Sequence, residues 1–166
     1  MRIRPIEPED LDFIYRMENT PELWDCSETD APYSRYALRE YLQHLRPVAE
    51  CGELRMVIET GPEPHFSAVG LTELTNISLL NARAEVGIAV EKSFRSENIG
   101  TRALTLLENI ARRRLRLHML YAKVGEKNNS ALQFFLRAGY TDVATLPHWH
   151  FIDGKYESAH LLEKIL

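Results

Sequence analysis

The chain is poor in the residues that mark a disulfide framework or a metal site. Its 166 residues include only two cysteines, Cys26 and Cys51, which are too few and too far apart for a disulfide scaffold or a CxxC site. Long apolar runs are also missing, because no stretch approaches the roughly 20 apolar residues of a membrane-spanning helix. The opening MRIRPIEPED lacks the apolar core of a signal peptide. We therefore expect a cytoplasmic protein with no membrane contact.

An excess of positive charge is lacking as well. The formal net charge is -4, so nothing draws the chain to nucleic acid except a local basic patch. The one basic cluster, within 112–116, comes late in an expected helix, where arginines complement the helix dipole, and we favour this over an RNA or CoA contact. The composition, 45% hydrophobic and 27% charged, is ordinary for a globular protein. A single domain over residues 1–166 is expected.

The hydrophobic pattern alternates between the periods of helices and strands. It predicts a mixed α/β (α+β) chain without repeats or linkers. The DG pair at 153 and 154 is a hairpin signal within the tail. The expected helices span 8–19, 34–49, 99–117 and 130–138, and the expected strands span 2–6, 53–60, 66–74, 84–90, 119–124, 140–145, 148–152 and 156–162, with an irregular acidic stretch at 19–33.

The segment RSENIGTRAL, residues 95–104, follows the expected strand AEVGIAV, residues 84–90. A loop of small polar residues that opens a helix presents free N–H groups and the positive end of the helix dipole, which favours an anion such as phosphate. On the strand, Glu85, Gly87 and Ala89 share one face. Two of these three side chains are small, so that face has room for a ligand.

Two segments together resemble the GCN5-related N-acetyltransferase (GNAT) superfamily. The first is the loop, where Arg95, Asn98 and Gly100 stand at the places of the motif Arg or Gln, two residues, Gly, one residue, Gly or Ala. Asn98 replaces the usual first glycine, and asparagine tolerates a positive φ better than most residues do. The second is GEKNNSALQFFLRAGY, residues 125–140, similar to the later signature in which an Asn precedes a short helix that ends in Gly and an aromatic residue.

The resemblance implies the GNAT fold: a mixed, mostly antiparallel central sheet flanked by helices, with a V-shaped splay between two central strands. It also implies acetyl-CoA as co-substrate, with the loop backbone on the pyrophosphate and the end of the preceding strand along the pantetheine arm. The residues that the resemblance assigns to this cofactor are Ile88, Ala89, Val90, Arg95, Ser96, Glu97, Asn98, Ile99, Gly100, Thr101, Asn128, Ser130, Ala131 and Phe134.

The opening and closing segments look similar to the branch that holds spermidine acetyltransferases and ribosomal-protein N-terminal acetyltransferases. Many members place a Tyr general acid in the last helix, six residues before the aromatic that follows the Gly. Phe134 and Phe135 stand near that position here. Because phenylalanine cannot donate a proton, another group or the solvent must supply it.

The reaction of this family needs an amine that has lost a proton and a donor for the departing thiolate. Glu85 is the expected base, acting through a water; the alternative is that it pairs with a basic neighbour or is solvated. His150, on the same strand face as His148, and Tyr140 are the further candidates. No metal is expected, because the two histidines lack a third ligand at a recognisable spacing.

The acceptor is expected to lie against the early helices, as in the family. Acidic residues interleaved with aromatics suit a cationic amine, although a solvated loop is the alternative. The substrate-binding residues expected there are Glu18, Trp24, Glu28 and Tyr33. The sequence thus predicts an N-acetyltransferase acting on a small amine such as a polyamine or on a protein N-terminus. The alternative is a catalytically silent acyl-CoA-binding module, and a homodimer is compatible with either.

Overall fold

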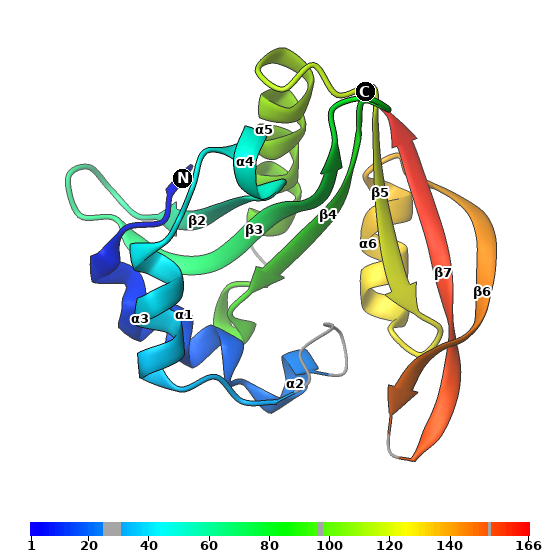
Figure 1. Ribbon diagram of the computed structural model, residues 1–166, viewed down its shortest axis with the longest axis horizontal. Coiled ribbons are helices and arrows are strands. Elements are labelled where there is room, and N and C mark those ends of the chain that lie inside the picture. The colour runs from blue at the N-terminus through cyan, green and yellow to red at the C-terminus, as the bar shows by residue number, and fades with distance from the viewer. Residues whose placement is uncertain (25–30, 96–97, 153) are drawn as a thin grey trace.

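The computed structural model describes residues 1–24, 31–95, 98–152 and 154–166, with the side chain of Trp24 excepted. One seven-stranded sheet carries the fold, in the order β1-β2-β3-β4-β5-β7-β6 (Figure 1). Its elements are β1 (Arg2–Pro5), η1 (Pro8–Asp10), α1 (Leu11–Glu18), α2 (Pro21–Trp24), α3 (Arg35–Gln43), α4 (Val48–Cys51), β2 (Leu54–Thr60), β3 (Ser67–Ser78), β4 (Arg83–Val90), η2 (Lys92–Phe94), α5 (Ile99–Arg113), β5 (Met119–Gly125), α6 (Asn129–Arg137), β6 (Thr141–Ile152) and β7 (Lys155–Ile165).

The centre of the sheet opens between β4 and β5, which are its parallel pair. Their ladder joins Arg83 to Met119, Ala84 to Leu120 and Glu85 to Tyr121, and it stops there. Beyond this point the two strands diverge, and Figure 1 shows the gap widening away from the C-terminus. All other strand pairs are antiparallel. The expected mixed, mostly antiparallel sheet with a V-shaped splay is therefore confirmed.

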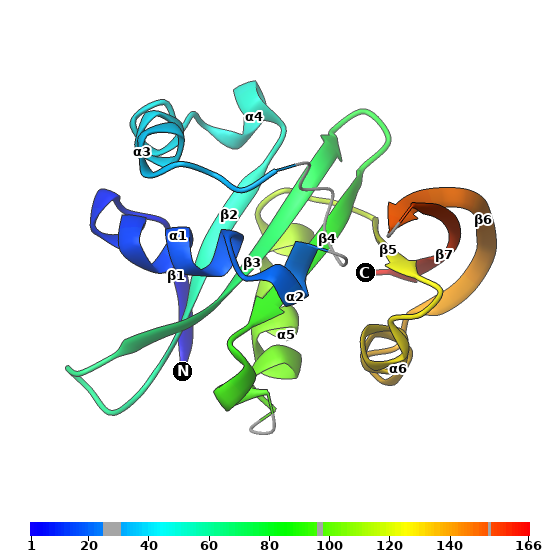
Figure 2. The same cartoon turned by 90° about the horizontal axis from the view of Figure 1, so that it is seen from below.

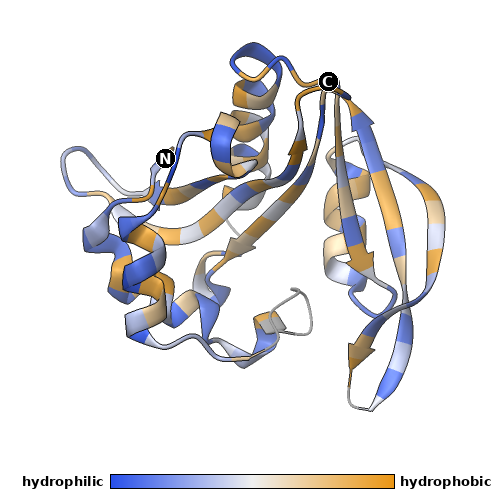
Figure 3. Ribbon diagram, viewed as in Figure 1, coloured by the Kyte–Doolittle hydropathy of each residue, from blue (hydrophilic) through white to orange (hydrophobic). Residues whose placement is uncertain are grey.

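Helices cover both faces of the sheet, and Figure 2 shows α5 and α6 on one side with α3 and α4 on the other. Ala84 and Val86 of β4 pack toward α5 in the largest apolar cluster, while Leu71 of β3 packs with α1 and α3. This alternation follows from the period of two in a strand. Figure 3 shows hydrophobic and hydrophilic segments along β7 as well, although there they do not alternate residue by residue. None of the described helices has both the length and the apolar character needed to cross a bilayer.

The stretch expected as one helix over 34–49 is two helices. Ser34 caps α3, and its hydroxyl accepts a hydrogen bond from the Ala37 N–H at 3.0 Å. The helix ends at Gln43, and Pro47 then opens the short α4. Because proline lacks an N–H and its ring clashes with the preceding turn, it cannot continue a helix. The helix expected to reach residue 117 likewise ends earlier, at Arg113.

The tail also differs from its sequence pattern. The segments expected as two short strands, 140–145 and 148–152, form the single strand β6. This strand lies at the edge of the sheet and pairs with β7. Its register against β7 shifts twice, once between Asp142 and Ala144 and once between Leu146 and His150. Extra residues in one strand of a pair are accommodated by bulges, which is why the pattern looked interrupted.

A network of ion pairs fastens the first strand. The Arg4 guanidinium donates to both carboxylate oxygens of Asp10, at 2.6 and 2.7 Å, and its Nε donates to Glu59 at 2.8 Å. Arg2 donates to the other oxygen of Glu59 at 2.7 Å. Asp10 and Glu59 are both buried. The network therefore ties β1, η1 and β2 together through two carboxylates withdrawn from water.

Candidate acetyl-transfer cleft

The splay between β4 and β5 encloses a cavity of about 420 Å³. Both strands contribute to its walls, with Glu85 and Gly87 on one side and Lys123 and Gly125 on the other. β3, α6 and the β6–β7 hairpin complete the lining with Glu73, Thr75, Asn128, Ala131, Phe135 and His150. The cleft is thus a mixture of apolar and charged groups at the one place where the sheet is open.

The backbone of β4 is exposed along this opening. Past Glu85 no described strand pairs with β4 on the β5 side, so the segment 86–90 keeps donors and acceptors available for an extended ligand. Ile88 lines the cleft, whereas Val90 lies at the second cavity described below. A chain with amide groups can bind such an edge as an added strand does. The end of β4 therefore has the chemistry expected of a pantetheine site.

The loop that follows β4 has the backbone conformation expected for it. Asn98 has φ 55° and precedes α5, and its carbonyl accepts a hydrogen bond from the Arg102 N–H at 3.1 Å. Ile99 is buried and fixes the loop to the core. A Cβ on Gly100 would lie 3.2 Å from the Phe134 ring, so the ring packs closely on this glycine. Ser96 and Glu97 lie outside the described residues.

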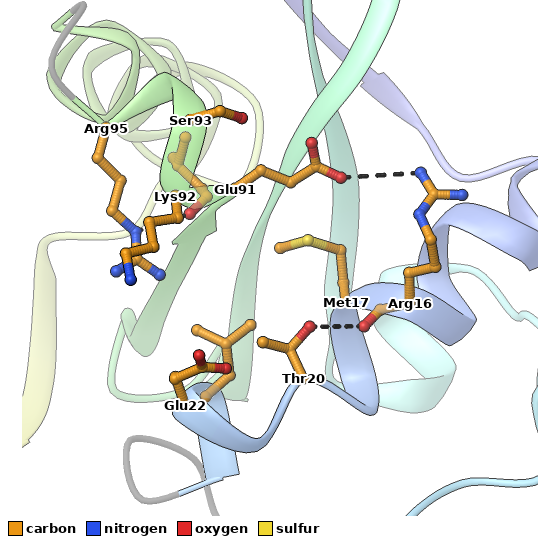
Figure 4. Close-up of a pocket in the computed structure, with 10 residues that line it drawn as sticks. Arg16, Met17, Thr20, Glu22, Glu91, Lys92, Ser93 and Arg95 are labelled. Carbon is orange, nitrogen blue, oxygen red and sulfur yellow. Dashed lines mark hydrogen bonds and ion pairs between the residues drawn. The ribbon is translucent and has the colours of Figure 1, made fainter.

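A second cavity, of about 630 Å³, lies between this loop and the helices α1 and α2 (Figure 4). Lys92, Ser93 and Arg95 line it from the loop, and Arg16 and Glu22 line it from the helices. The Arg95 Nε donates to the carbonyl of Val90 at 3.0 Å, which folds the loop back on the end of β4. Three cations line this cavity against two carboxylates, Glu22 and Glu91, and a Glu91 oxygen lies 3.7 Å from the Arg16 guanidinium, so a small excess of positive charge is left for an anionic group.

Asn128 caps the helix on the other arm of the cleft. Its side-chain oxygen accepts hydrogen bonds from the Ala131 N–H at 3.1 Å and from the Ser130 hydroxyl at 3.0 Å. An asparagine N-cap satisfies donors that the first turn leaves unpaired. Asn128 and Ala131 line the cleft, which agrees with their expected place beside the cofactor.

Glu85 lies in the cleft, but both of its carboxylate oxygens have partners. Asn76 donates to one oxygen at 2.9 Å, and the ammonium of Lys123 lies 3.3 Å from the other. The alternative considered from the sequence, a pairing with a basic neighbour, is what the structure contains. Lys123 in turn lies 5.3 Å from the centre of the Trp149 ring, so Glu85 belongs to a chain of contacts that crosses the cleft.

The two histidines of β6 have different surroundings. His150 lines the cleft, and its ring lies 3.8 Å from the place that a Cβ on Gly125 would take. His148 has φ 53° and is exposed, with its ring 6.4 Å from that of Tyr156. The register shift between Leu146 and His150 separates them. Strand alternation alone overlooks this bulge, and only His150 is placed to meet a ligand.

Tyr140 does not line the cleft as a proton donor should. It is 3% exposed and packs within the core, where its ring lies 5.0 Å from that of Phe135. Burial, together with the neighbouring Glu108 carboxylate, raises the pKa of Tyr140 far above its usual range. The candidate is therefore corrected: Tyr140 holds its proton and lies out of reach.

The phenylalanine that faces the cleft is Phe135. The count of six residues before Tyr140 points to Phe134, but Phe134 packs against Gly100 on α5, whereas Phe135 lines the cavity. Neither ring can donate a proton. The structure thus brings a plain benzene ring, that of Phe135, to the cleft one residue after the position that the family pattern gives for the tyrosine.

The expected acceptor residues are dispersed. Glu18 forms an ion pair with the largely buried Arg55, and Tyr33 is exposed, with its carbonyl accepting from the Asn19 amide at 3.0 Å. Glu28 lies outside the described residues, and so does the side chain of Trp24, which ends α2. Of the two members whose side chains the structure describes, Glu18 joins a network that reaches the cleft.

That network was missed from the sequence. Arg55 lies between Glu18 and Glu73, with its Nε 2.8 Å from a Glu73 oxygen, and Tyr41 donates to Glu53 at 3.0 Å beside it. The available signal was the strand sequence GLTELT, in which a glutamate interrupts an apolar alternation. Its meaning depends on strand register, which the sequence leaves open.

The described residues contain no group of three or more His, Cys, Asp or Glu side chains arranged to hold a metal ion.

These features are those of an enzyme that transfers an acyl group in the opening of a split sheet. The family model described as "Acetyltransferase (GNAT) domain" matches residues 1–141, and the chain belongs to this family. The family and the activity class expected from the two motifs, an N-acetyltransferase, are thereby confirmed.

Particular relatives share nearly the whole chain. Spermidine N(1)-acetyltransferase of Escherichia coli K12 is 27% identical over 162 residues, which cover 96% of this chain and 82% of that protein. The enzyme of the same name from Vibrio cholerae is 23% identical, covering 95% of this chain and 88% of that protein.

Solved structures confirm the fold. Spermidine N-acetyltransferase of Vibrio cholerae in complex with CoA and spermine superposes with a TM-score of 0.87 at 23% identity, covering 99% of this chain and 94% of that one. A dodecameric form of the Vibrio cholerae enzyme gives 0.82 at 24% identity, covering 99% and 92%.

Proposed function

We propose that this chain uses acetyl-CoA to acetylate a primary amine of a polyamine. The observation that carries the proposal is the open splay between β4 and β5, which is bordered by the carboxylates of Glu73 and Glu85. A polyamine is a chain of cationic amines, and partly buried carboxylates attract such a charge more strongly than surface carboxylates do. The relatives named above as spermidine acetyltransferases support the same acceptor class.

The residues of the β4 arm fit acetyl-CoA. The free backbone edge of 86–90 suits the amides of the pantetheine arm, and the start of α5 after Asn98 suits the pyrophosphate. Asn128 and Ala131 border the other side. When bound, the thioester supplies the acetyl group; the chain's own residues orient the acceptor, keep it in the cleft and take its proton.

The test is acetyl transfer by the purified protein. Release of free thiol from acetyl-CoA is followed with spermidine, spermine, a diamine, an amino sugar and a peptide amino terminus as acceptors. We expect turnover with spermidine and spermine, and little with the amino sugar and the peptide, which lack a chain of cationic amines. Turnover confined to the peptide would replace the polyamine by a protein N-terminus.

A second candidate is a module that binds acyl-CoA without turning it over, and one observation favours it. Phe135 occupies the cleft position that a proton-donating hydroxyl would need. If acetyl-CoA raises the melting temperature while no acceptor on the panel releases thiol, this candidate replaces the first. A Phe135→Tyr variant separates them further, because a gain of turnover on adding the hydroxyl requires an acceptor that already binds productively.

A further inference from the structure

Three residues line up across the sheet and end at the cleft. Arg55 of β2 is the register partner of Glu73 of β3, and Glu73 is the partner of Gly87 of β4. Side chains of directly opposed residues project from the same face of a sheet. The row therefore runs from the cation of Arg55 through the carboxylate of Glu73 to Gly87, which has no side chain and lies beside the opening.

Gly87 allows the carboxylate to reach the opening. A Cβ on Gly87 would lie 2.8 Å from Oε1 and 2.9 Å from Cγ of Glu73, so the Glu73 side chain lies over the space that any other residue would fill. Gly87 also borders the part of β4 that has lost its strand partner. Glu73 belongs to β3, which does not itself border the opening, and its side chain reaches the cleft by crossing over Gly87 of β4.

From this row we infer that Glu73 is the carboxylate that binds the acceptor's ammonium and takes its proton, and that Arg55 is the residue that positions Glu73. The inference rests on the proposed function, which supplies the acceptor class. It assigns the base to Glu73 in place of Glu85, because both oxygens of Glu85 are taken by Asn76 and Lys123. The Arg55 Nε lies 2.8 Å from the Oε2 atom of Glu73, and Oε1 lies toward Gly87.

The step balances without a further reagent. Glu73 accepts one proton from the ammonium, and the resulting amine forms the new C–N bond as the thioester C–S bond breaks. The second amine proton goes to sulfur, and Glu73 releases its proton to solvent. Turnover thus yields the amide, the free thiol and one proton.

The groups facing Glu73 set its proton affinity. Burial raises the pKa of Glu73, Arg55 opposes this, and the carboxylates of Glu18 and Glu53 raise it further. Burial alone would lower the pKa of Arg55, but Glu73 and Glu18 raise it well above its usual range, so it remains a cation. The other charged or titratable groups at the cleft are Tyr41, Glu85, Lys123 and His150.

The first measurement removes the carboxylate. Glu73→Gln is expected to lower kcat/KM for spermidine by about 100-fold, the usual share of a general base, without weakening acetyl-CoA binding. Glu9→Gln, an exposed carboxylate of η1, is the matched control and keeps full activity. The assignment is overturned if Glu73→Gln is as active as the control, or if Glu85→Gln alone abolishes the acid limb of the pH profile.

The second measurement tests positioning through the pH profile. Arg55→Met is expected to move the acid limb of kcat/KM upward by about one pH unit, because Glu73 loses its cation and binds its proton more tightly. Arg55→Lys keeps the charge and restores most of the original limb, whereas Glu18→Gln removes a neighbouring anion and moves the limb downward. A merely structural role for Arg55 would reduce the rate at every pH and leave the limb in place, which would contradict the inference.

Failure of the proposed function is distinguishable from failure of this inference. If the unmodified protein acetylates no amine, the function fails. The Glu73 carboxyl signal, followed by NMR with 13C-labelled glutamate while spermidine is added, then decides the inference alone. A response of Glu73 that is lost in Arg55→Met supports it, and an unresponsive Glu73 overturns it.

Discussion

Arg4 and Arg55 each bind two carboxylates, yet the two networks are balanced differently. Arg4 and Arg2 together face Asp10 and Glu59, so two cations serve two carboxylates. Burial alone would raise the pKa of Asp10 and of Glu59, but hydrogen bonds from the arginines hold both below their usual range. This network is a closed clamp at the edge of the sheet.

The network at the cleft has the opposite balance. One guanidinium, Arg55, faces Glu18 and Glu73, and Glu53 lies close enough to add its repulsion. Burial, together with the repulsion of Glu18 and Glu53, therefore keeps the pKa of Glu73 above its usual value even with an arginine beside it. The same residue types thus make a structural clamp where cations match carboxylates, and a proton acceptor where carboxylates outnumber them.

Arg4→Met should have the largest effect on stability. It leaves the buried Asp10 without its cation and Glu59 with only the exposed Arg2, and breaking a buried pair costs about 3 kcal/mol of the free energy of unfolding. Urea unfolding measures it, with Arg39→Met on the exposed side of α3 as the matched control. Transfer by the folded fraction is expected to be unchanged. An equal loss of rate at full folding would mean that the clamp also serves the cleft.

The clamp should also show in the acid dependence of stability. The pKa of Glu59 lies below its ordinary value of 4.5 in the folded chain, so its contribution is present above pH 4.5 and is lost as the pH falls through the folded pKa. Glu59→Gln should cost about 2 kcal/mol at pH 7, as for a hydrogen bond to a charged group. This difference should shrink in unfolding curves taken near pH 3, and a constant difference would show that Glu59 contributes by packing alone.

Gly87→Ala tests the cleft network by displacing the Glu73 carboxylate while leaving every charge of the network in place. The added Cβ would lie 2.8 Å from Glu73 Oε1, and a flexible side chain can move aside. Stability should hardly change, while kcat/KM for the amine should fall about tenfold, as for a misplaced catalytic group. Gly70→Ala is the contrast, because its Cβ would meet the Ala89 carbonyl at 2.5 Å and backbone cannot yield. Equal melting losses in the two variants would remove the distinction between them.

Tyr41→Phe should have the smallest effect. It removes the hydrogen bond to Glu53 at the margin of the cleft network, worth about 1 kcal/mol of the free energy of unfolding. Burial and Glu53 raise the pKa of Tyr41 to about 12, against the influence of Arg55, so the phenol stays neutral in the working range. A changed pH profile in this variant would place Tyr41 among the groups that tune Glu73.

Local signals predicted most of the fold and the backbone conformation at Asn98, before α5. Alternation along 84–90 and the turn residues between 60 and 66 specify strands from neighbouring residues alone, and Asn98 takes the positive φ that its residue type tolerates. The row from Arg55 to Gly87 could not be predicted in this way. Its neighbouring members are 18 and 14 positions apart in the sequence, and only the strand register places them opposite one another.

Glu85 illustrates the same limit within the site. Its place on the strand face was predictable from alternation, but its partner Lys123 comes from a strand reached through α5, and the parallel pairing of β4 with β5 decides their meeting. An interruption in the hydrophobic pattern can mean that an element ends or that it continues with an irregularity. At Pro47 the helix had already ended, whereas β6 continues through its bulges. The tertiary packing, and not the local sequence, decides between the two outcomes.

The two-residue excess in β6 decides which histidine borders the cleft. In a regular ladder continuing from the Leu146–Ala159 pair, the partner of Glu157 would be His148; in this chain it is His150. His150 lines the cleft, whereas His148 is exposed. The length of the bulge, and not the residue type, therefore determines which of the two imidazoles faces a ligand.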